Sequence, residues 1–247
     1  MNYLYIANWK MNLSYSQSLD FCTNNIDQLN ALVYSAQVVL CPSFVALGPI
    51  AQVLKKSSIT IGAQNCSEFE SGSYTGEVSA ASLAEIGVSY CIVGHSERRI
   101  YFGETTEKII KKINLLYANA MMPIICIGEN KEEFLQKKTI HALTEQLEPI
   151  LKTFVHQQYK HIIIAYEPFW AIGTGIIPEN TYLEEISIWL KNYVAEFAPD
   201  CTMQLLYGGS INEKNIHQLK TIKLIDGFLI GGASTNFETF CGIIKIG

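Results

Sequence analysis

The sequence lacks closely spaced cysteines. Its seven cysteines are at least 19 positions apart, so the Cys-x-x-Cys spacing of a zinc or thiol-redox motif is absent. Disulfide-stapled secreted domains carry an even number of cysteines at close spacing, whereas this number is odd and the residues are scattered. The pattern predicts reduced thiols in an intracellular protein.

Long apolar runs and an excess of basic residues are absent too. No run approaches the ~18 residues of a membrane span, and the first twelve residues hold no basic segment ahead of an apolar stretch, as a signal peptide would. We therefore expect a cytoplasmic protein with no membrane partner. Lys and Arg number 18 against 23 Asp and Glu, and this formal net charge of −5 argues against a nucleic-acid partner.

Apolar residues are plentiful and occur in short runs. They make up 49% of the 247 residues, which excludes a disordered chain. Eight continuously apolar runs are typical of parallel strands buried on both faces. These runs are Tyr3–Ala7, Gln37–Cys41, Ile59–Ala63, Tyr90–Val93, Pro123–Ile127, Ile162–Tyr166, Gln204–Tyr207 and Gly227–Ile230.

Helical spacing separates these runs. Ile109, Ile113 and Leu116 recur at helical intervals, and Gly87 ends the segment 79–86 as a left-handed cap would. Alternating strands and helices form a parallel sheet. Eight units of about 31 residues favour closure over an open sheet, and no G-x-G-x-x-G motif follows the first run. We predict an α/β fold, a (β/α)8 barrel of eight parallel strands with outer helices, spanning residues 1–247 as one domain.

Chemically useful residues follow five of the eight runs. Lys10 follows the first run, His95 the fourth and Glu167 the sixth, and Gly-Gly pairs follow the seventh and eighth. In a (β/α)8 barrel these strand ends meet at one rim, where active sites lie. Taken singly, each has a plain alternative: a solvated lysine, a hydrogen-bonded core histidine, a structurally paired acid or an ordinary turn. Their coincidence at five strand ends favours an active site.

The glycine pairs indicate an anion site. Paired glycines let backbone N–H groups approach a phosphate, and the loops after strands seven and eight are the usual phosphate site of such barrels. Ser210, after Gly208-Gly209, adds a hydroxyl donor. The segment Pro168–Pro178 is bounded by prolines and has a glycine-containing tip, which predicts a lid that moves as a unit.

At these residues the sequence resembles the triosephosphate isomerase family. The resemblance runs from about residue 6 to the C-terminus. It rests on motifs in a fixed order: residues 7–12 (ANWKMN), 62–65 (GAQN), 74–79 (YTGEVS), 94–99 (GHSERR), 165–175 (AYEPFWAIGTG), 207–210 (YGGS) and 227–234 (GFLIGGAS). It implies a TIM barrel that interconverts dihydroxyacetone phosphate and D-glyceraldehyde 3-phosphate without a metal ion or organic cofactor.

The resemblance also implies a role for each residue. Glu167 is expected to be the general base. His95 is expected to be a neutral electrophile, a tuning for which this family is the established case. Lys10 is expected to stabilise the oxyanion and Asn8 to orient the substrate, with Glu97 as a supporting acid. The expected phosphate ligands are Lys10, Gly173, Ser210, Gly231 and Gly232.

A homodimer is a further implication, in which the loop Gln64–Glu77, with Thr75, packs near the partner subunit's Asn8 and Lys10. Three positions depart from the family pattern. They are Phe169 where valine is commoner, a short Ile176-Ile177-Pro178 hinge, and Ser43 where a second proline is usual. We expect these departures to affect lid kinetics and to leave the reaction unchanged.

Three alternatives remain on the residues alone. Another phosphate-binding barrel shares the glycine pairs but lacks a histidine and a glutamate in this arrangement. A metal-dependent aldolase needs several metal ligands at the strand ends. The histidines other than His95 fall instead in helical stretches or at the opposite rim (residues 141, 156, 161 and 217). A catalytically silent homologue that binds a phosphorylated ligand is disfavoured, because every residue of the catalytic pattern is present.

Overall fold

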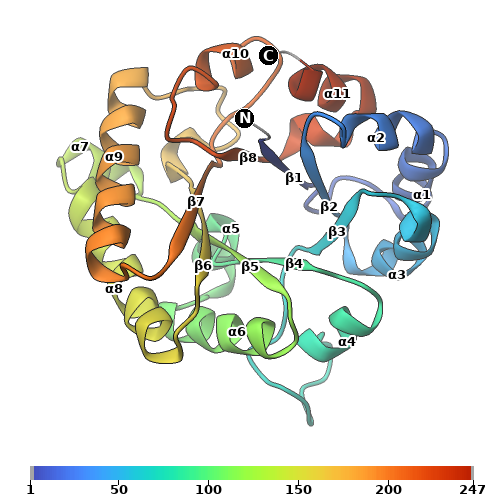
Figure 1. The fold of residues 1–247 in the computed structure, drawn as a ribbon, viewed down its shortest axis with the longest axis horizontal. Helices are drawn as coiled ribbons and strands as arrows, with labels where there is room; N and C mark the ends of the chain where they lie inside the picture. Colours follow the sequence, from blue (N-terminus) through green and yellow to red (C-terminus); the bar gives the residue numbers. More distant parts are fainter. Residues whose placement is uncertain (1–2, 246–247) are drawn as a thin grey trace.

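The computed structural model describes residues 3–245, which form a closed barrel of eight parallel strands in chain order (Figure 1). Each strand pairs with the next, and β8 pairs with β1 to close the ring. The strands are β1 (Leu4–Asn8), β2 (Gln37–Cys41), β3 (Thr60–Ala63), β4 (Tyr90–Val93), β5 (Met122–Ile127), β6 (His161–Tyr166), β7 (Thr202–Tyr207) and β8 (Gly227–Ile230). The predicted barrel is confirmed, and every predicted strand is present.

The strands are continuously apolar because both of their faces are buried. In β1, Leu4 and Ile6 belong to the small core inside the barrel, whereas Tyr5 and Ala7 belong to the larger core between barrel and helices. Side chains that alternate between two buried layers leave no position for a polar face. This double burial is the reason that the runs could be read from the sequence.

The inside of the barrel is filled by side chains, and β3 contributes a glycine to it. A Cβ atom at Gly62 would lie 2.5 Å from Cys41 Sγ and 2.9 Å from Val39 Cγ1. No larger residue fits there unless its neighbours move. The barrel interior is therefore a packed core, as in other barrels of this class.

The described connections are helical and surround the strands (Figure 1). The α-helices are α1 (Tyr15–Thr23), α2 (Ile26–Leu32), α3 (Phe44–Val53), α4 (Ala80–Glu85), α5 (Ser96–Phe102), α6 (Thr106–Ala118), α7 (Lys131–Leu135), α8 (Thr139–Gln157), α9 (Asn180–Phe197), α10 (Ile216–Leu219) and α11 (Phe237–Lys245). Short 3₁₀ helices are η1 (Leu54–Lys56), η2 (Phe169–Ala171) and η3 (Gly232–Thr235).

The predicted helical signals are confirmed. Ile109, Ile113 and Leu116 form the buried stripe of α6, and the Thr105 hydroxyl caps that helix by accepting from the Lys108 N–H. Gly87, one residue past the C-cap Ile86 of α4, has a φ of +87°, the left-handed conformation that glycine adopts without a Cβ penalty.

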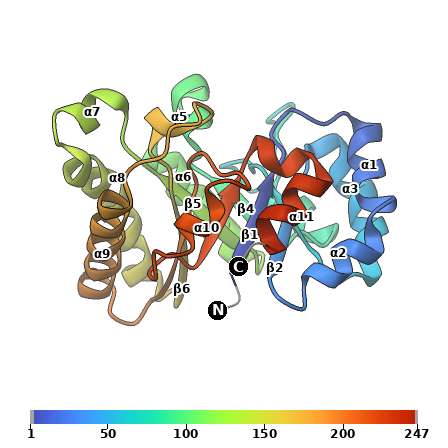
Figure 2. The same cartoon turned by 90° about the horizontal axis from the view of Figure 1, so that it is seen from above.

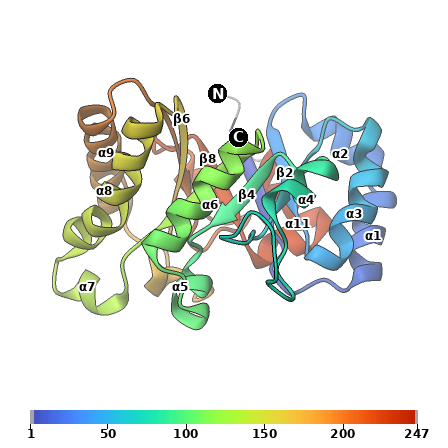
Figure 3. The same ribbon diagram turned by 90° about the horizontal axis from the view of Figure 1, so that it is seen from below.

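The strand ends face one side of the molecule. Figures 2 and 3 show α5 and α7, which follow β4 and β5, at the same end of the barrel. The rim predicted to carry the site is formed by these ends. Within residues 3–245, the helices fall short of the length and apolar character that crossing a membrane requires.

Barrel closure depends on a glycine in β8. Gly227 is the register partner of Leu4, and a Cβ at Gly227 would lie 2.1 Å from the Leu4 carbonyl oxygen. Gly227→Ala is expected to push β8 away from β1 and lower the free energy of unfolding by roughly 1–3 kcal/mol, as overpacking does. Urea denaturation measures this change.

Gly232→Ala is the matched control, because its added Cβ meets no atom within 4 Å. We expect the control to unfold like the native chain in the absence of ligand. Equal unfolding free energies for the two variants would contradict the close β1–β8 approach.

Candidate active site

Lys10 lies in the turn after β1 with a left-handed backbone. Its φ is +51°, which is uncommon for a residue with a side chain and costs roughly 1–3 kcal/mol. Asn8 Oδ1 accepts from the Lys10 N–H at 3.2 Å, and Gln64 Nε2 donates to the Lys10 carbonyl at 2.8 Å. These two contacts hold the turn. Gln64 belongs to the 62–65 (GAQN) motif of the resemblance, but that motif gave it no role in supporting the site.

The Lys10 ammonium is held between two strand ends. Its Nζ lies 2.6 Å from Oε1 of Glu97, in the first turn of α5. On the other side it approaches the turn after β8, where a Cβ at Gly231 would lie 3.3 Å from Lys10 Cε. A side chain at Gly231 would therefore be in tight contact with the Lys10 chain, which would have to shift slightly.

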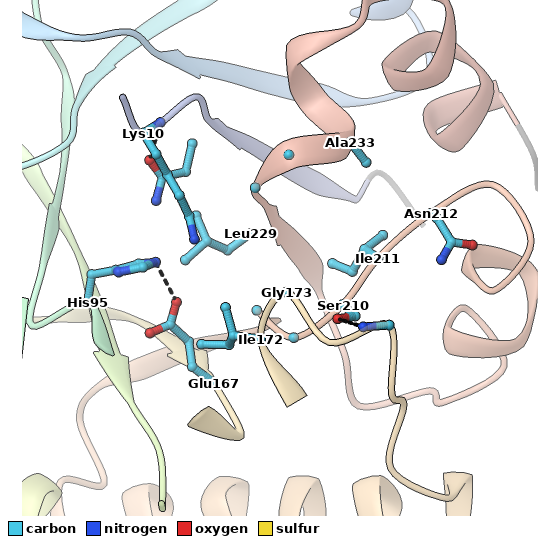
Figure 4. Close-up of a pocket in the computed structure, with 16 residues that line it drawn as sticks. Lys10, His95, Glu167, Ile172, Gly173, Ser210, Ile211, Asn212, Leu229 and Ala233 are labelled. Carbon is cyan, nitrogen blue, oxygen red and sulfur yellow. Dashed lines mark hydrogen bonds and ion pairs between the residues drawn. The ribbon is translucent and has the colours of Figure 1, made fainter. Parts of the chain in front are cut away.

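His95 is the N-terminal cap of α5. Its Nδ1 accepts from the backbone N–H of Glu97 at 3.2 Å. A nitrogen that accepts carries no proton, so the geometry assigns a neutral ring with its hydrogen on Nε2. Nε2 faces Glu167 (Figure 4). The imidazole is thus prepared to donate one hydrogen bond into the pocket.

Glu167 follows β6 directly, and its carboxylate is 1% exposed. Oε2 accepts from the backbone N–H of Ser96 at 3.0 Å. Oε1 lies 3.2 Å from His95 Nε2 without the alignment of a hydrogen bond, and no donor in the described residues satisfies it. A buried carboxylate oxygen that lacks a donor is poorly solvated.

Two glycines make room for Glu167. A Cβ at Gly128 would lie 1.7 Å from the Glu167 carbonyl oxygen, and a Cβ at Gly208 would lie 2.9 Å from Glu167 Cγ. Gly208 was predicted as part of the anion-binding turn, and the structure adds that it admits this side chain. Gly128 was not predicted; its only signal is a glycine directly after β5.

One pocket of about 250 Å³ brings most of the predicted residues together (Figure 4). Its lining includes eight of them: Asn8, Lys10, His95, Glu167, Gly173, Ser210, Gly231 and Gly232. Glu97 lies outside the lining and reaches the pocket through Lys10.

The end of this pocket that the sequence predicted to bind an anion is formed by backbone and by the segment 168–178, the predicted lid. The N–H groups of Gly173, Ser210 and Gly232 donate to no acceptor within residues 3–245. The Ser210 hydroxyl, predicted as a further anion donor, is instead engaged by the lid. It donates to the Ala171 carbonyl at 2.6 Å and accepts from the Gly175 N–H at 3.2 Å.

The lid is anchored at its first end by a buried carboxylate. Glu129 Oε1 accepts from Trp170 Nε1 at 2.8 Å, and the hydroxyls of Tyr166 and Tyr182 donate to Glu129 at 3.1 Å. Burial raises the pKa of the Glu129 carboxyl, although these donors oppose the shift. The Phe169 ring lies against Gly128. No sequence motif identified Glu129 as the anchor.

The turn before His95 rests on a second buried carboxylate. Glu104 accepts from the Gly94 N–H at 2.9 Å and from Lys112 Nζ at 2.9 Å, and it pairs with Arg98. Lys112 also donates to Asn65 Oδ1 at 2.8 Å, at the start of the predicted dimer loop. This network therefore connects the histidine turn to that loop.

The remaining histidines lie away from the pocket, as the sequence indicated: His141 and His156 in α8, His217 in α10 and His161 at the start of β6. Across residues 3–245, no three His, Cys, Asp or Glu side chains are grouped as metal ligands would be.

Glu104 gives a pH-dependent prediction. Burial raises its pKa, but Lys112, Arg98 and the Gly94 N–H outweigh burial and hold the pKa below its ordinary value. The ionised carboxylate therefore contributes stability above about pH 4.3, the ordinary value, and this contribution is lost as the pH falls through the lowered pKa.

Glu104→Gln is expected to lower the free energy of unfolding by roughly 3–5 kcal/mol at about pH 7, because it leaves Lys112 buried without its carboxylate. The difference from the native chain should narrow below about pH 4. Urea denaturation at both pH values measures it. A pH-independent difference would contradict the network's ionic character.

Comparison with known proteins agrees with this geometry. The family model for triosephosphate isomerase matches residues 3–247. The triosephosphate isomerase of Alkaliphilus metalliredigens is 38% identical over 242 residues, covering 97% of both chains. That of Colwellia psychrerythraea is 39% identical over 240 residues, covering 95% of this chain and 93% of its own. That of Porphyromonas gingivalis is 37% identical over 244 residues, covering 97% and 96%. The chain belongs to the triosephosphate isomerase family.

Proposed function

We propose that this enzyme interconverts dihydroxyacetone phosphate and D-glyceraldehyde 3-phosphate, a step of glycolysis and gluconeogenesis, with Glu167, His95 and Lys10 as its catalytic residues. The observation that carries the assignment of roles is the pairing of a buried carboxylate with a neutral imidazole across one pocket. An aldose–ketose isomerisation needs a base at carbon and a donor at oxygen.

Glu167 acts as the base in this proposal. It removes a proton from the carbon beside the carbonyl and returns it to the neighbouring carbon, through an enediolate. Its burial at the pocket supports this role, because water is kept away from the carbon where the proton moves. Oε1, which lacks a donor, is the oxygen we assign to proton transfer.

His95 and Lys10 stabilise the oxygen on which charge develops. The hydrogen on His95 Nε2 is donated to the carbonyl oxygen, and a neutral donor is better matched to an enediolate than an imidazolium. Lys10 contributes a positive charge, and Glu97 holds its ammonium in place. Asn8, buried beside Lys10, orients the substrate.

The substrate phosphate is bound by backbone amides in this proposal. Gly173, Ser210, Gly231 and Gly232 all line the pocket, so their N–H groups are the donors we assign to the phosphate, and Lys10 adds its charge. The lid keeps water from the enediolate, which would otherwise lose its phosphate. An acidic protein can thus bind an anion through local groups, without metal or cofactor.

Glu167→Gln keeps the shape of the side chain and removes the base. Its kcat is expected to fall by roughly 10²–10⁴-fold, as the loss of a general base does. Binding of a phosphate-bearing substrate analogue should survive. The measurement is a coupled assay with glyceraldehyde 3-phosphate. A native-like kcat would contradict the base assignment, and an inactive native chain would support the silent phosphate-binding homologue instead.

A homodimer is the second part of the proposal. Apolar side chains are exposed in the segments that follow β1 to β4, which are neighbours in the barrel: Met11, Val45, Tyr74 and Phe102. The loop Gln64–Glu77 between β3 and α4 projects from the barrel (Figure 1). A second copy that covers these side chains would remove them from water.

Phe102→Glu is expected to weaken this dimer, because a carboxylate replaces an apolar side chain that is 65% exposed in the single chain. Leu135→Glu on α7 is the control, since Leu135 is 68% exposed but follows β5, beyond the proposed interface. Sedimentation velocity should show a dimer for the native chain and the control, and a monomer fraction for Phe102→Glu. A monomeric native chain would contradict the proposal.

The cytoplasm is the compartment we propose. All seven cysteines are free thiols, and six of them are buried, in keeping with a reducing environment.

A further inference from the structure

The Ser210 hydroxyl cannot donate to a phosphate, because its contacts with the lid already use it. This hydroxyl has one hydrogen, and that hydrogen is given to the Ala171 carbonyl. Its oxygen also accepts from the Gly175 N–H. The lid therefore uses this hydroxyl, and only the Ser210 backbone N–H is left for an anion.

Asn212, two residues further along the same loop, has the opposite arrangement. Its Oδ1 accepts from the N–H groups of Lys214 at 2.9 Å and Asn215 at 3.2 Å, while its own N–H donates to Asn215 Oδ1. Two donors on Oδ1 fix the orientation of the amide. Nδ2 then points away from those partners and donates to no acceptor within residues 3–245.

Asn212 also lines the catalytic pocket. Figure 4 shows it beyond Ser210 and Ile211, on the far side of the pocket from His95 and Glu167. The other amide side chain of the lining, Asn8, is committed through its Oδ1 to the Lys10 turn beside the catalytic groups. Asn212 thus has two N–H hydrogens without an acceptor in the described residues, on the side of the pocket where Ser210 lies (Figure 4).

We propose that Asn212 determines specificity for a phosphorylated substrate by donating a hydrogen bond from Nδ2 to a peripheral oxygen of the phosphate. This assignment rests on the proposed isomerase function. A donor to an anion is worth more than a donor to a neutral group. The same residue holds the loop through Oδ1, so one side chain both shapes the anion site and enters it.

Asn212→Asp separates these two tasks. Aspartate keeps an oxygen for the Lys214 and Asn215 N–H groups, as Asp and Asn serve equally well in such turns. It replaces Nδ2 with a second carboxylate oxygen, which repels phosphate. We expect kcat/KM for glyceraldehyde 3-phosphate to fall by roughly 10- to 100-fold, mostly through KM.

Two controls isolate the contact. Glyceraldehyde carries no phosphate, so its kcat/KM should change much less. Asn236→Asp adds the same charge in the loop between η3 and α11, keeps its Oδ1 contact with the Thr239 N–H and does not line the pocket. It should leave the constants for glyceraldehyde 3-phosphate near those of the native enzyme.

Inorganic phosphate, used as a competitive inhibitor or as a titrant in calorimetry, tests the same contact without turnover. Its affinity should fall in Asn212→Asp and be retained in Asn236→Asp. If Asn212→Asp fails to fold, Asn212→Ser takes its place. The serine hydroxyl still accepts from nearby N–H groups but is too short for the phosphate, so phosphate affinity should again fall.

Unchanged phosphate affinity in a folded Asn212 variant would overturn the assignment. An equal loss with glyceraldehyde and with glyceraldehyde 3-phosphate would also overturn it, because that result indicates a structural role for the loop. A native chain that binds phosphate through Asn212 but isomerises neither substrate would overturn the proposed function alone.

Discussion

The first turn of α5 holds the three proposed catalytic groups. The Ser96 N–H holds one oxygen of Glu167, the Glu97 N–H holds His95 Nδ1, and the Glu97 carboxylate holds Lys10. The first N–H groups of a helix have no carbonyl partner within that helix, and here they have two roles. They fix the position of the base, and they require the imidazole to be the neutral tautomer that donates from Nε2. A small rotation of this turn would disturb all three groups together.

Closure of the barrel brings Lys10 and Glu167 to the same rim as the first turn of α5. Lys10 and Glu167 are far apart in sequence, yet they follow strands whose ends meet at one rim because every strand runs in the same direction. Supporting residues then secure the rim. Buried carboxylates at Glu104 and Glu129 hold the histidine turn and the lid, and glycines at 128 and 208 admit the glutamate. The site is thus held by buried contacts at the strand ends and connected to the lid through Ser210.

The strands and the rim residues could be predicted because they depend on local pattern. Double burial makes each strand a continuous apolar run, and the residue after such a run is at the rim. Gln64, Glu104 and Glu129 could not be predicted, because their importance comes from side-chain contacts with residues distant in sequence. The Ser210 hydroxyl was expected at the anion and is used by the lid, since the position of the lid relative to β7 is not a local property.

Solvent isotope incorporation tests the central claim most directly, because it reports the fate of the proton that Glu167 is proposed to carry. Glyceraldehyde 3-phosphate is converted in D₂O, and NMR follows deuterium on the carbon of dihydroxyacetone phosphate that receives the proton. A carboxylate base that holds the proton can exchange it with solvent, so the account predicts product that contains deuterium at that carbon. Rapid isomerisation with complete retention of the original hydrogen is the result expected of direct hydride transfer, and it would contradict transfer through a carboxylate that exchanges its proton with solvent.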